Sequence, residues 1–252
     1  MDIKDLKKAG INNADKVDIK EIEVKEKNRK IKFEEIKIEK EHKHPQKIKK
    51  FLDKLWFHVW KDNSVKGWIV TIIFLFVVIK FMFFPLMSLA TGTVLPLAIV
   101  ESCSMYHDGN IASNFDKWWE RHDEKYSEFE ITKNEFENYK FSNGFNKGDI
   151  LFIVGANPEK IKIGDVIIFN AQKSNPLIHR VIEIKTNYET GEKTFSTIGD
   201  NNNGQLSVET NIKENQLVGK AIFKPAPYLG WVKLIFYEPQ RSVYERGFCE
   251  EN

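Results

Sequence analysis

Residues 94–108 read Val-Leu-Pro-Leu-Ala-Ile-Val-Glu-Ser-Cys-Ser-Met-Tyr-His-Asp. The apolar run 95–100 has the length of a short buried strand, and it ends in small polar side chains at Ser102 and Ser104. Alternate side chains of a strand lie on the same face, so these two hydroxyl groups should point the same way. The stretch predicts a strand that presents two serines at its end.

A long apolar segment comes shortly before this strand. Residues 68–87 are almost entirely apolar, and twenty helical residues at about 1.5 Å each span about 30 Å, the thickness of a bilayer core. The segment lies too far from the N-terminus, and is too long, for a cleaved signal peptide. Lys80, in its outer half, can extend to the membrane interface. We therefore predict one transmembrane helix at 67–87.

Basic residues are distributed unevenly around this helix. Six lysines lie at 47–66, whereas neither Lys nor Arg occurs between Lys80 and Lys117. Positive charge stays on the cytoplasmic side of a membrane segment. We expect a single-pass protein of the cell membrane, with residues 1–66 in the cytoplasm and the rest of the chain outside.

The Lys/Glu-rich residues 1–66 allow two readings. Apolar residues partly alternate with charges, so a small hairpin that turns near Asn28 is possible. A solvated, partly helical tail fits equally simply, and we favour it slightly. Lysines and aromatic residues interleave at 47–66, which suits either a helix lying on anionic membrane lipid or an ordinary amphipathic helix beside the membrane.

A β domain is expected at 88–236, followed by a C-terminal tail at 237–252. Short β-branched runs separated by Gly, Asp, Asn and Pro predict strands at 149–154, 165–169, 178–184, 194–198 and 216–223. The Gly-Asp pairs that end at Asp149 and Asp165 each precede a strand and resemble a repeated turn. Several short strands without intervening helices indicate a mainly β, antiparallel architecture.

Residues 109–143 differ from the rest of this domain. Aromatic and His side chains recur at helical spacing at Phe115, Trp118, Trp119 and His122. Thr132 and Glu135 have the spacing of a capping box that begins a second helix. We expect a helical insertion. Aromatic residues at such spacing form a small core or an interface more often than a ligand site, and we expect the same here.

Composition excludes some classes of function. The 252 residues carry a net charge of only +2, which favours no nucleic-acid partner. The two cysteines, Cys103 and Cys249, do not form a disulfide framework, and we interpret both as free thiols. No His/Cys spacing resembles a zinc site, so neither a metal nor another cofactor is expected.

Three side chains could form a nucleophilic site. A serine hydroxyl needs a neutral imidazole to take its proton and a carboxylate to orient that imidazole. Ser104 is the candidate nucleophile, His179 the base and Asp200 the acid, and the Ser102 hydroxyl could help to hold the oxyanion. Taken singly, each has a more common structural explanation. The serines can simply end a strand, the histidine can be a half-buried strand residue, and the aspartate can form a turn.

Their order along the chain resembles that of a known family. Residues 102–105, Ser-Cys-Ser-Met, are similar to the Ser-x-Ser-Met box of type I signal peptidases. Residues 164–166, 178–182 and 199–202 resemble the following boxes of that family. Bacterial members carry a catalytic lysine where His179 stands, so the resemblance is to the archaeal and endoplasmic-reticulum branch, which uses Ser and His.

This resemblance implies a membrane-anchored serine endopeptidase with an antiparallel β catalytic domain. Its substrates would be secretory preproteins that bind as an extended strand beside 95–100, and translocon or accessory subunits would be possible partners. The chain departs from the family at His107, where a proline is usual, and at Leu206, where a second Asp is common. We expect Asp200 to be the acid, with Glu209 as its substitute if the loop folds back.

Two rival interpretations remain open. The domain could be a catalytically silent β module, tethered to the membrane, that binds extended peptides. Alternatively, the thiol of Cys103 could be the nucleophile, although the resemblance favours Ser104.

Overall fold

The computed structural model describes residues 13–108, 115–171 and 175–250, without the side chains of 13–22 and 35–47. The start of the predicted tail and residues 109–114 of the predicted insertion therefore lie outside the described residues. The chain divides into two compact units, Met1–Val78 and Ile79–Asn252, which are considered separately.

The first unit contains the long helix α2 (Asn13–Trp60) and, after a short turn, α3 (Val65–Val78). Lys and Glu have good helix propensity, and pairs such as Glu23 and Lys27 are spaced to attract one another along a helix. Because α2 is continuous, the hairpin considered near Asn28 is wrong. A hairpin would need a turn-forming signal, whereas the residues around Asn28 are mostly helix formers.

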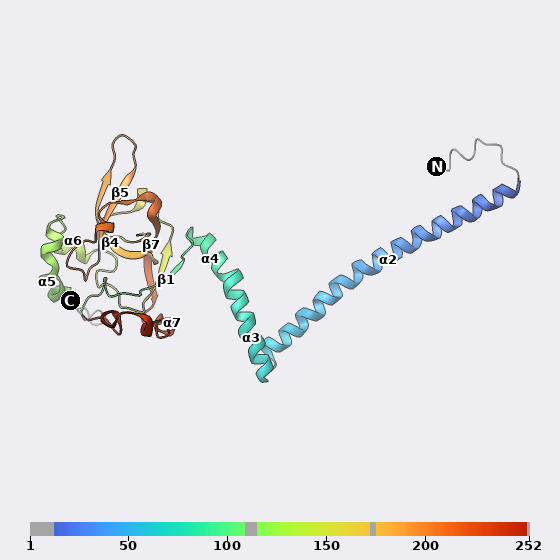
Figure 1. The fold of residues 1–252 in the computed structure, drawn as a ribbon, viewed down its shortest axis with the longest axis horizontal. Coiled ribbons are helices and arrows are strands. Elements are labelled where there is room, and N and C mark those ends of the chain that lie inside the picture. Colours follow the sequence, from blue (N-terminus) through green and yellow to red (C-terminus); the bar gives the residue numbers. More distant parts are fainter. Residues whose placement is uncertain (1–12, 109–114, 172–174, 251–252) are drawn as a thin grey trace. The chain divides into compact units, whose positions relative to one another are not determined.

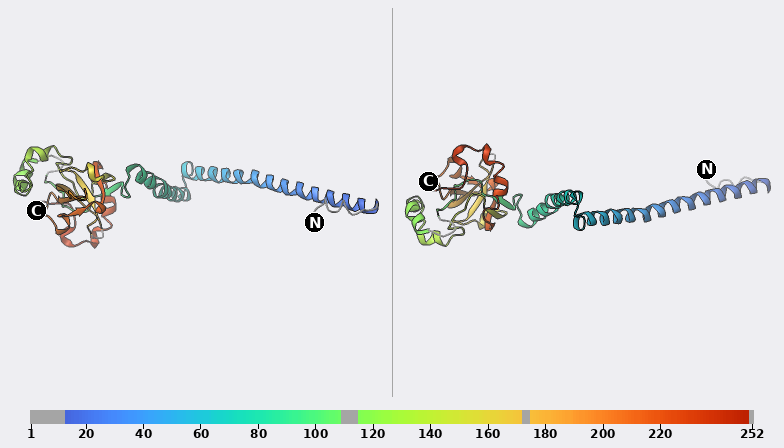
Figure 2. Two further views of the ribbon diagram at one scale, coloured as in Figure 1. Left: turned by 90° about the horizontal axis from the view of Figure 1, so that it is seen from above. Right: turned by 90° about the horizontal axis from the view of Figure 1, so that it is seen from below.

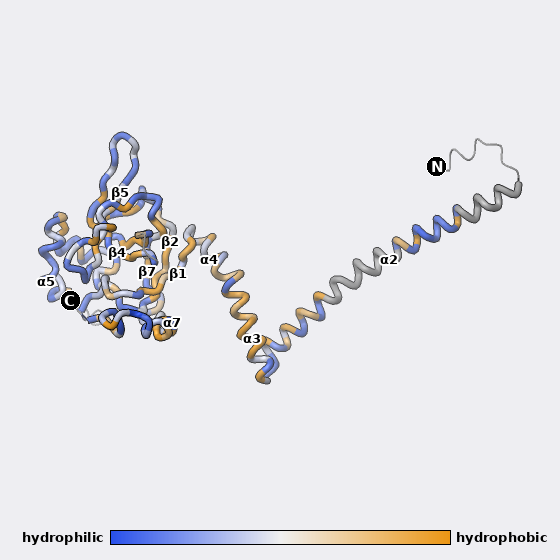
Figure 3. Tube along the Cα trace, viewed as in Figure 1, coloured by the Kyte–Doolittle hydropathy of each residue, from blue (hydrophilic) through white to orange (hydrophobic). Residues whose placement is uncertain are grey.

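The predicted membrane segment is helical. Val65–Thr91 is 27 residues long and apolar enough to cross a membrane once, and its apolar character is visible in Figure 3. It consists of α3, a π-helical turn η1 (Ile79–Phe83) and α4 (Phe84–Thr91). Pro85, near the start of α4, lacks a backbone N–H, which accounts for the local change of helical register. Gly92 ends α4 in the left-handed conformation.

The second unit is built on one curled antiparallel sheet, so the mainly β fold class is confirmed (Figure 1). Its strands are β1 (Leu97–Ile99), β2 (Ile150–Val154), β3 (Val166–Phe169), β4 (Leu177–Thr186), β5 (Lys193–Ile198), β6 (Ile212–Lys213) and β7 (Leu217–Ala226). Their spatial order is β1-β2-β7-β3-β4-β5-β6. The strand β1 is therefore an edge strand, and only the two-residue β6 has no counterpart among the predicted strands.

The two Gly-Asp pairs form the same turn, as their sequence suggested. Gly148 and Gly164 have φ values of 89° and 88°, which glycine adopts readily. The following carboxylates accept backbone N–H groups three residues earlier, at 2.8 Å for Asp149 and 2.9 Å for Asp165. The first turn leads into β2, which is buried at alternate residues, and the second leads into β3, which is buried throughout.

The helical insertion contains α5 (Phe115–Ser127) and α6 (Lys133–Glu137), which lie together beside the sheet (Figures 1 and 2). The predicted capping box is present, since the Thr132 hydroxyl accepts from the Glu135 N–H and the Glu135 carboxylate accepts from the Thr132 N–H. The aromatic side chains form a buried cluster of their own, with Trp118, Tyr126 and Phe136 at its centre. The cluster packs on Ile182 and Ile198 of the sheet.

The C-terminal residues return to the domain instead of forming a loose tail. They contain α7 (Trp231–Leu234), η5 (Glu238–Gln240) and η6 (Val243–Glu245); the remaining short helices are η2 (Pro158–Lys160), η3 (Ser207–Glu209) and η4 (Glu214–Gln216). Lys147 is buried and binds Glu238 at 2.8 Å.

Cys103 and Cys249 form a disulfide, so the interpretation of both as free thiols is wrong. The prediction failed because 146 residues separate the two cysteines, and only the return of the C-terminal segment brings them together. The bond also leaves Cys103 without the free thiol that a cysteine nucleophile requires.

Candidate active site

Ser104 follows the edge strand β1 and lies against His179. Its Oγ is 2.8 Å from Nε2 of His179, and the Oγ of Ser102 is 3.2 Å from the Oγ of Ser104. Ser104 is half-buried, whereas Ser102 is exposed. The structure thus brings both serines to one side of the chain, beside an imidazole.

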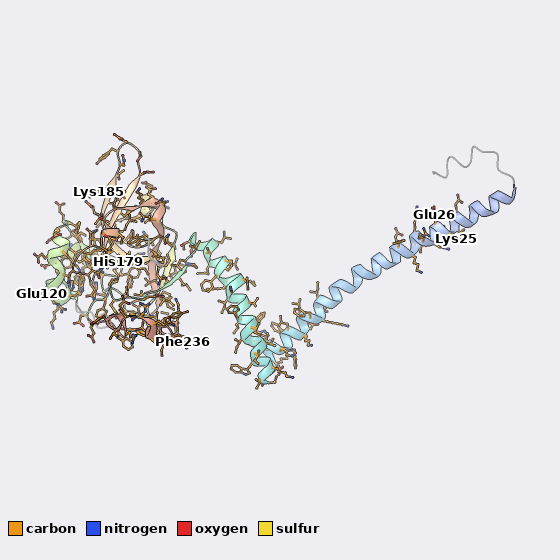
Figure 4. All side chains as sticks on the ribbon, in the orientation of Figure 1. Lys25, Glu26, Glu120, His179, Lys185 and Phe236 are labelled. Carbon is orange, nitrogen blue, oxygen red and sulfur yellow. A yellow bond between two sulfur atoms is a disulfide. The ribbon has the colours of Figure 1, made fainter. Side chains whose placement is uncertain are left out.

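His179 occupies the middle of the sheet, where β4 pairs with β3 and His179 lies opposite Ile167. Figure 4 labels it in the interior of the domain. Only 2% of the residue is exposed. Its ring is therefore held by the sheet between Ser104 on one side and a carboxylate on the other.

That carboxylate belongs to Glu209, whose Oε1 meets Nδ1 of His179. The same oxygen accepts from the Thr197 hydroxyl at 3.1 Å, and Oε2 accepts from the Leu206 N–H at 2.7 Å. An ionised carboxylate only accepts hydrogen bonds, so Nδ1 carries the imidazole proton. The lone pair of Nε2 then faces the Ser104 hydroxyl.

Asp200 is fully buried, but the structure does not place it beside His179. Its carboxylate accepts from Arg180 Nη2 at 2.6 Å, from His107 Nε2 at 2.9 Å and from the Tyr126 hydroxyl at 2.8 Å. Burial by itself raises the pKa of Asp200, but the Arg180 charge and these hydrogen bonds outweigh it and hold the pKa below its ordinary value. Asp200 therefore neutralises a buried arginine.

Glu209, expected only as a substitute, is thus the carboxylate beside His179, and Asp200, the first choice, is not. Successive residues of a strand point to opposite faces, so His179 and Arg180 require separate carboxylates. This alternation was visible in the sequence, whereas the burial of Arg180, and with it the need for an anion, comes from the structure. Which carboxylate reaches which face depends on how residues 199–209 fold back.

His107 stands where proline is usual in the family that the sequence resembles. It is one of the hydrogen-bond partners of the Asp200 carboxylate. Its ring stacks on Trp118 with 3.7 Å between centroids. Burial is the main cause of the lowered pKa of His107, so the neutral ring donates its Nε2 proton to Asp200. Sequence reasoning missed both His107 and Tyr126 as partners of this carboxylate.

A groove of about 440 Å³ leads to the two serines. One wall is the edge strand β1, which pairs with β2 on one side only within the described sheet. Phe145, Ile168 and Ile178 line its apolar interior. An unpaired strand edge beside an apolar groove can accept an extended peptide through main-chain hydrogen bonds.

Charged residues also line this groove. Glu101 forms ion pairs with Lys233 at 3.1 Å and with Arg241 at 2.9 Å. Both cations come from the C-terminal segment, and both line the groove. The sequence contained no signal for their position next to Ser102.

No three His, Cys, Asp or Glu side chains are placed to share a metal ion in the part of the chain that the structure describes.

Comparison with known proteins adds an independent observation. The chain is similar to signal peptidase complex catalytic subunit SEC11C of Homo sapiens, with 29% identity over 106 residues, which are 40% of this chain and 54% of the relative. The corresponding subunits SEC11 of Zygosaccharomyces rouxii and Lodderomyces elongisporus are 37% and 33% identical over 36% and 38% of the chain, and 56% and 60% of their own lengths. The chain thus spans little more than half the length of these curated relatives. No protein-family model matches it.

Proposed function

Since the chain is a homologue of the SEC11 catalytic subunits of signal peptidase complexes, we propose that it is a membrane-anchored serine endopeptidase that removes signal peptides from secretory preproteins. The observation that carries this proposal is the 2.8 Å contact between Ser104 Oγ and His179 Nε2, two residues that line the groove of about 440 Å³. A nucleophile within hydrogen-bond reach of its base is the arrangement that acyl transfer requires.

In the proposed reaction Ser104 attacks the carbonyl carbon of the scissile peptide bond while His179 takes the hydroxyl proton. The negatively charged oxygen would be stabilised by the Ser102 hydroxyl and a backbone N–H at the strand end. His179 would then give its proton to the leaving amine, which releases the mature protein and leaves an acyl group on Ser104. A water molecule, deprotonated by His179, would hydrolyse this ester. Glu209 would orient the imidazole and stabilise its charged form.

The substrate would bind as an extended strand beside β1. Main-chain hydrogen bonds along the strand edge would supply affinity for any peptide sequence, and shallow pockets would select small side chains at the cleavage site. The groove is lined by Leu97 and Ile99 of β1 and by Ile178 of β4, so a strand added beside β1 would contact apolar side chains.

We further propose that residues 67–87 anchor the protein in a membrane, with 1–66 on the cytoplasmic side and the domain at 88–236 on the opposite side. The helix Val65–Thr91 is compatible with a single span, and the lysines before it favour this orientation. The Cys103–Cys249 disulfide supports it, since disulfides persist in oxidising compartments. The matched relatives are named as subunits of a complex, so accessory subunits are proposed partners, together with membrane lipid.

Cleavage of a preprotein by the full chain in detergent or in vesicles tests the activity. We expect wild type and Ser242→Ala, which alters an exposed serine, to cleave equally, and Ser104→Ala to lose activity. Unchanged cleavage by Ser104→Ala would exclude the proposed nucleophile. Binding of the preprotein without any cleavage by wild type would favour the silent peptide-binding module. Protease protection in sealed membrane vesicles of known orientation tests the topology, since a β domain on the same side as residues 1–66 would contradict it.

A further inference from the structure

The turn at 199–202 is bonded to the backbone of the proposed nucleophile. The Asn201 N–H donates to the Ser104 carbonyl at 2.8 Å, and the Asn201 side-chain amide donates to the Cys103 carbonyl at 3.1 Å. The approach is close at Gly199, where a Cβ would lie 2.8 Å from the Ser104 carbonyl oxygen. These contacts hold the backbone of Ser104 against this turn, so a displacement of the turn should displace Ser104 as well.

Helix α5 of the insertion holds the same turn from its other side. Lys125 Nζ donates to the carbonyl of Asp200 and, at 2.9 Å, to the carbonyl of Asn202. The neighbouring Tyr126 donates its hydroxyl to the Asp200 carboxylate at 2.8 Å. Two consecutive side chains of one helix thus hold both the backbone and the side chain of the turn.

Helix α5 is itself well anchored. Tyr126 is fully buried, and its ring stacks on Trp119 with 5.6 Å between centroids. Phe136 of α6 packs against both rings, and Arg180 of β4 lies over Phe136 at 4.5 Å. The turn is therefore bonded to a helix whose buried face packs on the sheet.

Lys125 is suited to this role because its ammonium group offers three donors at the end of a long side chain. The group is half-buried, and burial lowers the pKa of Lys125 to about 8, so the amine still carries its charge at neutral pH. Hydrogen bonds from a charged donor are stronger than neutral ones.

We propose that Lys125 and Tyr126 are positioning residues that hold the turn at 199–202, and through it Ser104, in the geometry needed for attack on the peptide bond. The catalytic part of this inference rests on the proposed peptidase function, whereas the structural link does not. It assigns to the insertion the task of keeping the nucleophile in place. Since a displacement of about 1 Å can cost about 100-fold in rate, a loosened turn should lower kcat.

Two substitutions in the full chain test the link. Lys125→Met removes the donors and keeps a long apolar side chain, and Tyr126→Phe removes only the hydroxyl. Lys117→Met, at an exposed position on the same helix, and Tyr139→Phe serve as matched controls. Hydrogen exchange, followed by mass spectrometry of peptides that contain 199–204, should become about tenfold faster in the two test variants and stay unchanged in the controls.

Peptidase kinetics on the same proteins test the catalytic consequence. Lys125→Met should lower kcat about 10-fold to 100-fold and leave KM within about twofold, and Lys125→Arg, which retains charged donors, should recover part of the loss. Exchange at 199–204 as slow as in wild type would overturn the structural link. Faster exchange with an unchanged kcat would overturn the positioning role. If wild type cleaves no preprotein, the proposed function fails, while the exchange measurement still decides whether the link exists.

Discussion

The carboxylate of Glu209 meets the Nδ1 atom of His179, although thirty residues separate them in the chain. The Thr197 hydroxyl donates to one oxygen of this carboxylate and the Leu206 N–H donates to the other, which fixes the orientation of the carboxylate. The Ser104 hydroxyl, the imidazole and this carboxylate form one continuous chain of hydrogen bonds. Because His179 Nδ1 has a buried acceptor, its Nε2 is kept free to accept a proton.

Glu209→Gln should lower kcat about 10³-fold to 10⁴-fold with little effect on KM, because an amide can donate to Nδ1 and favour the wrong imidazole tautomer. Steady-state cleavage of a preprotein by the full chain measures this. Glu192→Gln, at an exposed position, is the matched control. A Glu209→Gln enzyme with wild-type kcat would show that His179 does not depend on this acid.

Ser102→Ala should lower kcat by about 10²-fold to 10³-fold, the usual effect of removing one donor from an oxyanion site. The Ser102 hydroxyl lies 3.2 Å from Ser104 Oγ, so it can reach the carbonyl oxygen of a peptide that Ser104 attacks. Ser102→Thr keeps a hydroxyl group and should retain more activity than Ser102→Ala. Equal activities of these two variants would exclude a hydroxyl-dependent role.

Asp200 should make the stability of the fold sensitive to acid. Its pKa is held below the ordinary value, so its contribution is fully present above about pH 4 and is lost as the pH falls from there toward the lower pKa of the folded state. Below about pH 4, each further unit of pH should remove at most about 1.4 kcal/mol of the free energy of unfolding through this one carboxylate.

Denaturant titrations of the full chain between pH 3 and pH 7 measure this dependence. Asp200→Asn should be less stable at every pH, because it leaves Arg180 buried without its anion, and should show a weaker dependence on pH. An acid dependence as steep in Asp200→Asn as in wild type would assign the effect to another carboxylate.

Cys249→Ser should lower the free energy of unfolding by about 2–5 kcal/mol, the range for loss of a disulfide that closes a long loop. A reducing agent should destabilise wild type by a similar amount and leave Cys249→Ser unchanged. Thermal or denaturant midpoints, recorded with and without reductant, make the comparison. Equal midpoints for reduced and oxidised wild type would show that the C-terminal segment is held by its other contacts, such as that between Lys147 and Glu238.

Much of the fold was predictable because it depends on local patterns. The run 68–87 has the length and apolar character of a membrane span, and alternation with Gly-Asp turns marked the strands that the structure contains. The Thr132–Glu135 capping box was recognised because its hydrogen bonds join residues three apart. The hydroxyl groups of Ser102 and Ser104 lie 3.2 Å apart as expected, although the chain forms a turn there and not the strand on which the expectation rested.

Tertiary structure alone decided the partners of these groups. Alternation along β4 shows that His179 and Arg180 face opposite ways, but only the fold assigns Glu209 to the first and Asp200 to the second. The Cys103–Cys249 bond is of the same kind, since it joins residues 146 apart. Periodicity reports which face of an element is buried, whereas a contact between distant residues depends on strand register and on how the loops return.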